Sequence, residues 1–568
     1  VPAPSINQAG TMVGTFVLTF RPYGRTINVA STSTFLGINQ VFCEGLGSGG
    51  TVNNSGILSV NTIFQVSGGA TFNNSVGGIL TLRKNVTILS GGIFTATGNP
   101  NTVTYTGINW SNIHNTTYHH LSIAHSGVTV TNKFLLGNTT INGDLTIASN
   151  AQLHCQNFNV TIAGNWINDC STVSTTGLGG TFTFTGATPS IRRLTNEETL
   201  GNVVVSCTGS FIPNSALTPG YTGNFNCNNL TLASGTLDLN STANYTVSVT
   251  GNMTRTAGTL NGRNGLINFI GTAAQTISGG ALTFSNIRSA NTAGVSTSSA
   301  HNMTGTLTVA SGTFTSATAN FTLISNTTTG ITARIGTSAG TVAGSRWVVQ
   351  RRILTGAPSS SAPYWGDYAS PVSGTTLSDW DSEMYMSGVG GADGTACCPT
   401  FYSVCQWNNG GADYSNVTSL IPLVPGYGYS AWTANNLGAF YPLTFDTRGT
   451  PNGGTLVVGT PAATYYLLGN PYPSQILFSA LTRVGVNNRF YVLDETIQDY
   501  ATWSGATGTG KLAGGGGVIN SSQGFMVEST GGGSVTFTEA SKTTTNVTFV
   551  KEALPQDMVK YHFSKEGK

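Results

Sequence analysis

Residues 103–107 read Val-Thr-Tyr-Thr-Gly, and two later segments repeat this pattern: residues 182–186 read Phe-Thr-Phe-Thr-Gly, and residues 267–271 read Ile-Asn-Phe-Ile-Gly. In each copy apolar and polar residues alternate, as in a β-strand with one buried face, and a glycine follows that permits a tight corner. The copies begin at residues 103, 182 and 267. Recurrence at nearly constant steps predicts a repeat architecture.

A second landmark recurs with the same period. The segment Leu-Thr-Ile-Ala-Ser begins at residue 145, and close copies of it begin at residues 230 and 307. Because two unrelated landmarks keep their order and spacing, we interpret residues 103–345 as three supermodules of about 80 residues.

Shorter echoes lie within this period. Ser-Gly-Gly at residues 67–69 returns at 90–92, and Gly-Asp-Leu-Thr at 143–146 is echoed by Gly-Asn-Trp-Ile at 164–167. Steps of about 20 residues are typical of the coils of a β-solenoid. We therefore expect a parallel, β-helix-like solenoid with aliphatic ladders inside and Thr, Ser and Asn ladders outside.

The composition favours an all-β protein and excludes several functions. The chain has 568 residues, of which 74 are glycines and only 8% are charged, against roughly 25% in an average soluble domain. The net charge of +2 leaves no basic stripe for nucleic acid. No run approaches the ~20 apolar residues of a membrane helix, so we expect no membrane insertion.

The first residues and the cysteine count point to export. Residues 1–4 (Val-Pro-Ala-Pro) carry neither an initiator Met nor a charged-then-apolar leader, as in a mature chain whose signal peptide has been removed. Eight cysteines without metal-ligand spacing also suit an exported protein. We expect an extracellular or cell-surface location.

At residue 346 the character of the sequence changes. Six of the eight tryptophans lie between Trp347 and Trp503, and short apolar segments alternate with Gly/Pro turns. This pattern predicts an antiparallel β-sandwich. The expected organisation is an N-terminal arm with a capping or donor strand (1–44), the β-solenoid (45–345), the β-sandwich (346–550) and a charged C-terminal tail (551–568).

Five motifs in this second half carry a resemblance to a known family. They are Trp-Val-Val-Gln-Arg at 347–351, Ser-Pro-Val at 370–372, Pro-Gly-Tyr-Gly at 425–428, Gly-Asn-Pro-Tyr-Pro-Ser at 469–474 and Gln-Gly-Phe-Met-Val at 523–527. Their succession resembles large surface proteins of Bacteroidota that are exported by the type IX secretion system. The resemblance covers residues 100–560 and implies a β-repeat region before this module. The C-terminal sorting domain of that family does not follow, which fits a mature form. The family implies location and architecture but no single activity.

The cysteine spacing predicts disulfides. Residues 207 and 227 are 20 positions apart, about one coil, so stacking would bring their Cα atoms within bridging range. Adjacent cysteines rarely pair with each other, so the third cysteine of the Gly-rich loop at 397–405 is expected to bond to one of the other two. The expected pairs are Cys207 with Cys227, Cys155 with Cys170, and Cys405 with Cys398 or Cys397.

One acidic motif is a candidate calcium site. Asp379, Asp381 and Glu383 alternate, so a strand would place all three carboxylates on one side. Calcium takes six to eight oxygen ligands, and such a row could supply some of them. The alternative is a charged, solvated face that blunts an edge strand. No other cofactor is expected.

Catalytic residues are not evident. Solenoid lyases and glycosidases need clustered carboxylates on one face. The five acidic residues between 45 and 345 are scattered along the sequence; they are Asp144, Asp169, Glu197, Glu198 and Asp238. We expect the three aspartates to be exposed charges that contribute little to stability. We therefore expect no enzyme.

Tryptophans of the second half offer a different function. Their side chains could stack on sugar rings, or they could form the core of the sandwich, which is the favoured interpretation. The candidates are Trp365, Trp380, Trp407, Trp432 and Trp503.

The function that follows is structural. A solenoid has open ends, and the β-prone segment 11–20 suits strand addition onto another chain or capping of its own solenoid. We expect a secreted, non-enzymatic surface protein that associates end to end into a filament or serves as an adhesin stalk. Its partners would be copies of itself and extracellular glycans. The alternatives are a glycan-binding adhesin and a polysaccharide-degrading β-helix enzyme. The residues expected to mediate self-association are Thr11, Met12, Val13, Phe16, Val17, Leu18 and Phe20.

Overall fold

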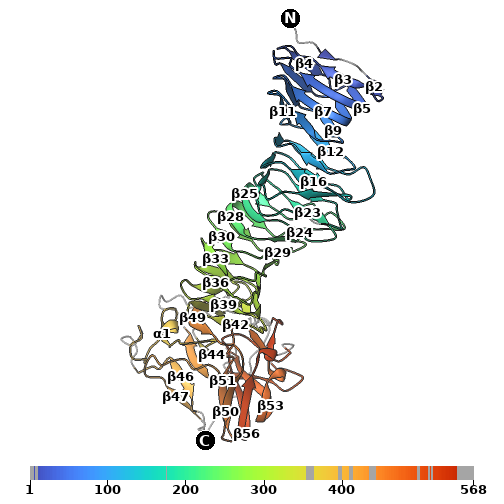
Figure 1. Cartoon of the computed structure of the whole chain (residues 1–568). Helices are drawn as coiled ribbons and strands as arrows, with labels where there is room; N and C mark the ends of the chain where they lie inside the picture. Colours follow the sequence, from blue (N-terminus) through green and yellow to red (C-terminus); the bar gives the residue numbers. More distant parts are fainter. Residues whose placement is uncertain are drawn as a thin grey trace, which may run out of the picture. The chain divides into compact units, whose positions relative to one another are not determined.

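A computed structural model describes residues 5–6, 10–173, 175–353, 364–394, 400–408, 413–433, 443–494, 499–509, 512 and 516–546. The chain divides into two compact units, Val1–Ser285 and Asn286–Lys568. The fold is nearly all β, with a parallel β-solenoid of about 15 turns and antiparallel sheets in its C-terminal part. The sequence-based fold class is therefore confirmed (Figure 1).

The first unit is built from parallel sheets along which successive coils stack (Figure 1). Sheet A contains β1 (Ser5–Ile6), β4 (Thr26–Val29), β6 (Thr51–Asn54), β8 (Thr71–Asn74) and β11 (Ile93–Thr95). Sheet B contains β2 (Gly10–Val13), β5 (Ser33–Glu44), β7 (Ile57–Ser67), β9 (Ile79–Leu82), β12 (Thr102–Tyr105), β15 (His120–Ile123), β18 (Leu145–Ile147), β21 (Trp166–Asn168), β23 (Ile191–Leu194) and β26 (Tyr221–Thr222), with β3 (Val17–Phe20) on β5 and β10 (Val86–Ile88) on β7.

Three further sheets complete the coils of this unit. Sheet D contains β13 (Ser111–Ile113), β16 (Thr131–Leu135) and β19 (Ala151–His154). Sheet C includes β14 (Thr117–Tyr118), β17 (Thr139–Ile141), β20 (Val160–Ile162), β22 (Thr181–Phe184), β25 (Asn202–Phe211), β28 (Leu230–Asp238), β30 (Met253–Arg255), β31 (Thr259–Asn261) and β33 (Gln275–Gly279). Sheet E includes β24 (Glu198–Thr199), β27 (Phe225–Cys227), β29 (Thr246–Val249) and β32 (Leu266–Phe269); β34 (Thr283–Phe284) follows.

Side-chain ladders hold these coils together, as the alternation predicts. Inside, the rings of Phe72 and Phe94 lie one coil apart with centroids 6.3 Å from each other. On the other face of the same strands, the Asn73 amide donates to Asn53 at 3.2 Å, and the Asn53 amide donates to Asn28 at 3.0 Å. In these first coils, stacking therefore buries apolar area inside and pairs amides outside, at the spacing of one strand.

Strand pairing confirms the short echo and explains the long period. Leu145 of β18 pairs with Trp166 of β21, which is the step that the Gly-Asp-Leu-Thr echo predicts. The motif that recurs with the long period falls on β12 in sheet B, β22 in sheet C and β32 in sheet E. The long period is therefore not a whole number of coils, and within the first unit each copy moves to another sheet.

The second unit begins with three coils and continues as antiparallel sheets. The coils pair in parallel in the orders β35-β38-β41, β36-β39-β42 and β37-β40-β43. Their bounds are β35 (Asn286–Ala290), β36 (Val295–Thr297), β37 (His301–Met303), β38 (Thr306–Ser311), β39 (Thr313–Ser316), β40 (Phe321–Leu323), β41 (Arg334–Ile335), β42 (Thr341–Ala343) and β43 (Trp347–Ile353).

The antiparallel part holds two larger sheets, H and M, and several short strands. Sheet H contains β44 (Tyr364–Ala369), β48 (Gly428–Thr433), β46 (Val404–Trp407) and β47 (Tyr414–Asn416). Sheet M contains β50 (Leu456–Thr460), β51 (Tyr465–Gly469), β53 (Thr482–Asp494), β54 (Asp499–Trp503) and β56 (Gly524–Phe537). The remaining elements are β45 (Val372–Ser373), α1 (Ser378–Asp381), β49 (Leu443–Pro451), β52 (Gln475–Leu477), β55 (Val518–Ile519), β57 (Lys542–Thr543) and the 3₁₀ turns Phe478–Ala480 and Glu539–Ser541.

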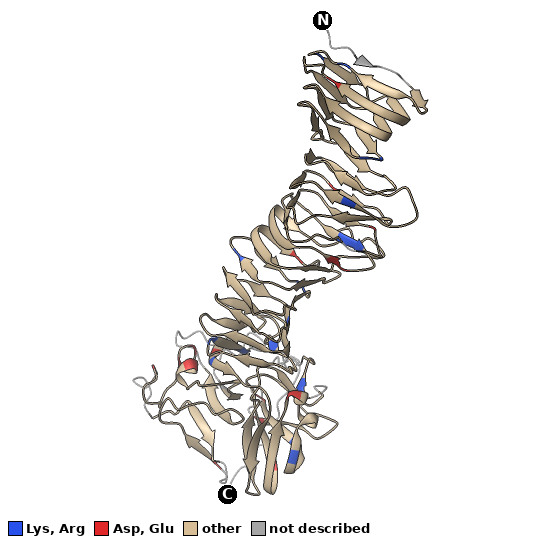
Figure 2. Cartoon of the chain, in the orientation of Figure 1, with Lys and Arg blue, Asp and Glu red and all other residues tan. Residues whose placement is uncertain are grey.

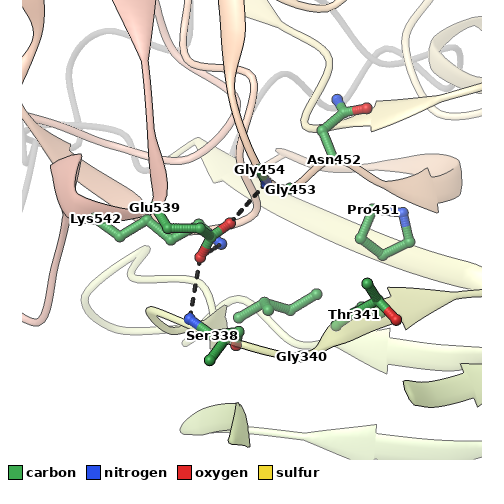
Figure 3. Close-up of a pocket in the computed structure, with 12 residues that line it drawn as sticks. Ser338, Gly340, Thr341, Pro451, Asn452, Gly453, Gly454, Glu539 and Lys542 are labelled. Carbon is green, nitrogen blue, oxygen red and sulfur yellow. Dashed lines mark hydrogen bonds and ion pairs between the residues drawn. The ribbon is translucent and has the colours of Figure 1, made fainter. Parts of the chain in front are cut away.

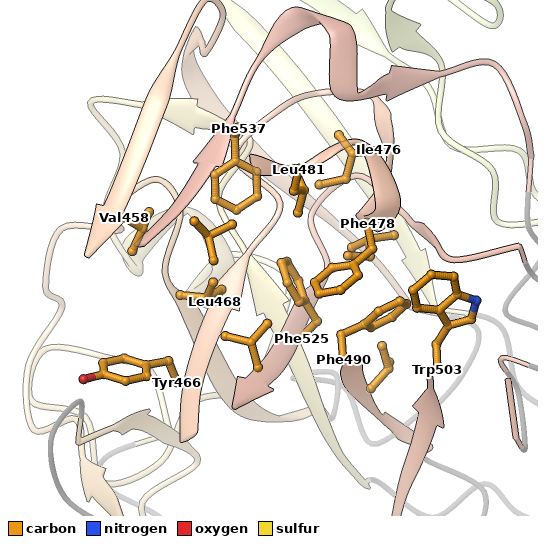
Figure 4. Packing of buried hydrophobic residues seen from close by; sticks show 14 of the residues in the cluster. Val458, Tyr466, Leu468, Ile476, Phe478, Leu481, Phe490, Trp503, Phe525 and Phe537 are labelled. Atoms are coloured by element: carbon orange, nitrogen blue, oxygen red, sulfur yellow. The ribbon is translucent and has the colours of Figure 1, made fainter. Parts of the chain in front are cut away.

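Two hydrophobic clusters stabilise the antiparallel part. One lies on sheet M and packs Phe478, Phe490, Trp503 and Phe525 ring against ring (Figure 4). The other surrounds Trp380 of α1 and includes residues of β44, β48 and β49. Aromatic rings lie at the centre of both clusters beside aliphatic side chains, in keeping with the tryptophans after residue 346.

Candidate functional site

The most specific motifs of the second half meet at one junction of backbone segments. The side-chain amide of Asn470 donates to the carbonyl oxygens of Ser474 at 2.8 Å and Asn520 at 2.9 Å. Its backbone N–H donates to the carbonyl of Gln523 at 2.9 Å. Asn470 is fully buried. Its side chain thus satisfies buried backbone carbonyls of the Pro-containing turn and of the neighbouring segment at Asn520, so it fixes how these two segments lie against each other.

Two of the other motifs join the same junction. The backbone N–H of Ala369, just before the Ser-Pro-Val segment, donates to Ser522 at 3.1 Å. The N–H of Gly469 donates to Gly426 of the Pro-Gly-Tyr-Gly segment at 2.9 Å. These motifs therefore set how sheets H and M meet, which is a structural role.

The last coil of the solenoid is closed by the antiparallel part of its own unit. Strand β43 pairs antiparallel with β49 over seven residues, from Trp347 opposite Gly449 to Ile353 opposite Leu443. Strand β41 is covered as well, because the N–H of Ile335 donates to the carbonyl of Pro473 at 2.8 Å. The backbone edge that a solenoid leaves open is thus paired at this end.

A cavity of about 320 Å³ lies beside this closure, between β42, the turn at 451–454 and the segment carrying Glu539 and Lys542 (Figure 3). The Glu539 carboxylate accepts hydrogen bonds from the backbone N–H groups of Ser338 at 3.1 Å and Gly454 at 3.0 Å, and it pairs with the Lys542 ammonium at 2.9 Å. Burial lowers the pKa of Lys542, while the charge of Glu539 acts in the opposite direction. The Glu539 carboxylate thus connects the last coil to the turn at 453–454 and to Lys542, and the cavity lies beside this structural contact.

The opposite situation holds at the first coil of the first unit. Strands β2 and β3 pair in parallel with β5 along one edge only, so within the described part of the chain their other edge has no partner. Every described side chain of β2 is exposed, and Val13 and Val17 are 73% and 54% exposed. Phe20 is the buried end of this segment, so residues 11–20 form the first rung of their own solenoid and leave an apolar open edge.

The scattered acidic residues of the solenoid are mostly engaged in structural contacts. The contacts are Asp144 with the backbone N–H of Asn165 at 2.7 Å, Asp169 with the Tyr221 hydroxyl at 2.7 Å, Asp238 with the Arg263 guanidinium at 2.7 Å, and Glu198 with the Trp166 indole N–H at 3.0 Å. The expectation that Asp238 is exposed is wrong, because only 8% of this residue is accessible. Each of these four carboxylates therefore has a hydrogen-bond donor or a cation as a partner.

The acidic motif at 379–383 is not on a strand. Asp379 and Asp381 lie in the helical turn α1, which places Asp379 and Glu383 on one face, four residues apart. Arg448 lies between them, 3.7 Å from Asp379 and 3.0 Å from Glu383, and it also contacts Asp446 at 3.0 Å. The guanidinium thus supplies the positive charge that calcium would have supplied. Among the described residues, no group of three His, Cys, Asp or Glu side chains is arranged to hold a metal ion.

The predicted disulfides of the solenoid are wrong. Cys207 and Cys227 are both buried and free. The coil that follows β25 carries the chain from Val203 to its partner Leu230, and this step is longer than the separation of the two cysteines. Cys227 therefore lies on sheet E, whereas Cys207 lies on sheet C.

The predicted pairing of Cys155 with Cys170 is wrong as well. Cys155 and Cys170 are also buried and free, because Cys155 follows β19 of sheet D whereas Cys170 follows β21 of sheet B. Cys405 is free. Its expected partners, Cys397 and Cys398, and the tail at 551–568 lie outside the described residues.

Three of the five candidate tryptophans are engaged in packing or hydrogen bonds. Trp380 and Trp503 are 0% and 4% exposed in the two cores. The Trp407 indole N–H donates to the carbonyl of Tyr465 at 2.7 Å. Trp380 and Trp503 therefore support the core-packing interpretation, whereas Trp407 is only partly buried and is held by its hydrogen bond.

The remaining two gather with a residue that the sequence did not single out. Trp365 and Trp432 are cross-strand partners on β44 and β48, with ring centroids 5.7 Å apart. Phe401, 42% exposed, completes the group at 6.3 and 5.8 Å from them. The rings pack edge-on or tilted against one another and do not form a flat row.

No protein-family model, curated protein or solved structure matches this chain. No helix in the described part is long and apolar enough to cross a bilayer. The fold therefore defines the class, a β-solenoid with a C-terminal antiparallel module, and this fold is consistent with a structural or adhesin role.

Proposed function

We propose that this chain is a non-enzymatic structural protein of the bacterial cell surface, whose solenoid associates end to end with further copies of itself. The observation that carries the proposal is the difference between the two solenoid ends. Three strands of the last coil face an antiparallel module of their own unit, whereas β2 and β3 of the first coil present an unpaired edge within the described part of the chain.

The chemistry of that edge favours association. An exposed β-edge with apolar side chains is a template for pairing with another chain, and natural proteins blunt such edges with Lys, Pro or bulges. Here Met12, Val13 and Val17 are 37%, 73% and 54% exposed, and no charged residue lies in 10–20. A contact between this edge and a different surface of the next copy is heterologous, and such contacts propagate when they do not close.

Two further observations support the proposal. Four of the five motifs that resemble type IX secretion substrates of Bacteroidota lie at the junction of sheets H and M, and the fifth, residues 347–351, lies on β43; the likeness favours an exported surface protein of that kind. The carboxylates of the solenoid are scattered and largely tied to structural donors, which favours a role without catalysis.

The experiment replaces the apolar edge and measures assembly. On association the next copy would bury the exposed parts of Val13 and Val17, which is worth about 3 kcal/mol for the two side chains. The double variant Val13→Lys with Val17→Lys loses this burial, so the association constant is expected to fall about a hundredfold. Sedimentation velocity over a concentration series and negative-stain electron microscopy follow the polymers. The matched control is Val76→Lys, because Val76 is 58% exposed and lies away from the edge.

The proposal is supported if the wild type and Val76→Lys form polymers and the edge variant does not, while the circular dichroism of the edge variant is unchanged. A wild-type protein that stays monomeric at all concentrations contradicts it. Polymers that survive both edge substitutions show that the first coil is not the connector.

A further inference from the structure

Three successive turns of the solenoid stack at one corner of the first unit. They comprise residues 83–85 between β9 and β10, residues 106–110 between β12 and β13, and residues 124–130 between β15 and β16. The N–H of Thr106 donates to Leu82 at 2.8 Å, and the N–H of Ser126 donates to Thr106 at 3.1 Å. The latter two turns are longer than the first.

The two longer turns expose apolar side chains at their tips. Val128 is 100% exposed, Trp110 is 74%, Ile108 is 61% and Val130 is 37%. Single exposed apolar residues are ordinary, but four on two stacked turns form a patch, and such patches mark interaction sites.

Two polar side chains, one of them buried, hold the turns in this conformation. The Lys133 ammonium, fully buried, donates to the carbonyl oxygens of Gly107 at 2.5 Å and Asn109 at 2.8 Å, on both sides of Ile108. The Asn150 amide donates to the carbonyl of Gly127 at 2.8 Å, next to Val128. The tips are therefore presented by a fixed backbone, which reduces the entropy lost on binding.

Trp110 is supported from below. The ring of Phe134 on β16 lies edge-on to it, with centroids 6.0 Å apart. The indole of Trp110 thus contacts Phe134 with one edge and stays exposed to solvent, although burial in the core would be favourable for so large a ring.

The charge around the patch has one sign. No Asp or Glu occurs between Glu44 and Asp144, whereas Arg83, Lys84 and Lys133 do. Arg83 and Lys84 are exposed on the turn directly beside residues 106–110. Burial, and to a lesser extent the charge of Lys84, lowers the pKa of Lys133 to about 8. Figure 2 shows that charged residues are sparse along the first unit. The three turns therefore combine apolar tips with exposed cations and contain no carboxylate that would repel an anion.

We propose that this corner docks the solenoid sideways onto a lipid surface with anionic headgroups. Ile108, Trp110 and Val128 enter the boundary between headgroups and acyl chains, where indole rings are favoured. Arg83 and Lys84 face the lipid phosphates. A sugar chain would prefer flat aromatic faces and polar partners, and two of these three tips are aliphatic. The contact is adsorption on one leaflet, and the chain does not cross the bilayer.

The test measures binding to vesicles by sedimentation, with the full chain at a concentration below self-association. Vesicles of phosphatidylcholine alone are compared with vesicles that also contain phosphatidylglycerol. The wild type is expected to bind the second kind, and high salt is expected to release it because screening removes the attraction of exposed charges.

The variants separate the two components of the surface. Arg83→Ser with Lys84→Ser is expected to weaken binding about 25-fold, because each cation near an anionic surface contributes roughly fivefold. Val128→Asp and Trp110→Ser are expected to weaken it at least tenfold. Both positions are so exposed that the fold does not depend on them. The matched controls, Arg25→Ser and Val76→Asp, alter an exposed cation and an exposed valine elsewhere and are expected to bind like the wild type.

Three results would overturn the proposal. One is the absence of binding to phosphatidylglycerol vesicles, and another is equal binding to phosphatidylcholine alone. The third is a loss of self-association in the Val128 or Trp110 variant with vesicle binding intact, since the patch would then be a contact between copies. Vesicle binding is read independently of polymers, so the failure of this proposal and of the structural function are distinguishable.

Discussion

Glu198 is a buried carboxylate inside the first unit, and its removal is expected to open the coil around it. The residue begins β24 and has 0% exposure. One of its oxygens accepts from the Trp166 indole N–H at 3.0 Å and from the Asn168 amide at 2.6 Å, and the other accepts from the N–H of Thr199 at 3.0 Å.

The substitution Glu198→Ala strands two buried donors, those of Trp166 and Asn168. A buried donor without an acceptor costs about 1–3 kcal/mol, so the two together are expected to destabilise this coil by about 2–6 kcal/mol. Glu197→Ala is the matched control, because Glu197 is the preceding residue and is exposed; its effect is expected to stay within about 0.5 kcal/mol.

The pH dependence of this effect has a definite sign. Burial raises the pKa of Glu198 above its usual range, while the hydrogen bonds from Asn168 and Trp166 and the charge of Arg193 act in the opposite direction. A carboxyl whose folded pKa is raised stabilises the fold fully below its unfolded pKa, about 4.3, and this contribution is lost as the pH rises through the folded value. Glu198→Gln, which cannot ionise, is therefore expected to gain stability relative to the wild type as the pH is raised from about 4 to 7.

Native-state hydrogen exchange is the suitable assay, because a chain of two units need not unfold in a single step. The reporters are the amides of Trp166, which donates to Ser190, and of Leu200, which donates to Asn226. Faster exchange at both in Glu198→Ala, with Glu197→Ala unchanged, is the expected result. Equal protection in the two variants would refute the reasoning, and so would a Glu198→Gln advantage that shrinks as the pH rises.

Two further predictions concern the cysteines and the motif junction. Alkylation of the native protein is expected to label Cys405 and to spare the five buried thiols, because burial disfavours the reactive thiolate and raises, for example, the pKa of Cys43 to about 12. After unfolding without reductant, all six of these thiols should react. If Cys207 and Cys227 react only after reduction, the two cysteines form a disulfide after all. Asn470→Ala leaves the carbonyls of Ser474 and Asn520 without their donor and is expected to destabilise the second unit by about 2–4 kcal/mol. The control Asn416→Ala removes an exposed amide and should change the melting temperature of the protein little. Equal effects of the two substitutions would mean that Asn470 is not the centre of the junction.

Much of the fold was predictable because its signals are local. Alternation within strands such as residues 103–107 and 182–186 depends only on neighbouring residues, and the step from 145 to 166 shows directly as strand pairing. The change of composition at 346 correctly indicated antiparallel sheets.

The candidate sites were less predictable because they depend on coil length. One coil carries the chain from Thr102 to its partner His120, whereas a much longer coil carries it from Thr306 to its partner Arg334. A fixed spacing in the sequence therefore does not say which side chains stack, which is why the Cys207–Cys227 disulfide was wrong. The prediction that residues 379–383 form a strand was wrong for a related reason. Trp380 is buried against β49 from a helical turn, and a helical turn does not place alternate residues on one side.

The sequence by itself thus determined that the chain is an all-β solenoid followed by an antiparallel module, because alternation, glycine corners and composition act over a few residues. The tertiary structure alone decided which end is closed, which cations and carboxylates are buried, and where apolar side chains meet solvent. Those outcomes depend on contacts between residues at least one coil apart. Glu198 inside the coil and Lys133 beneath Ile108 are polar residues in ordinary-looking stretches of sequence, and only the stacking of coils places them in the interior.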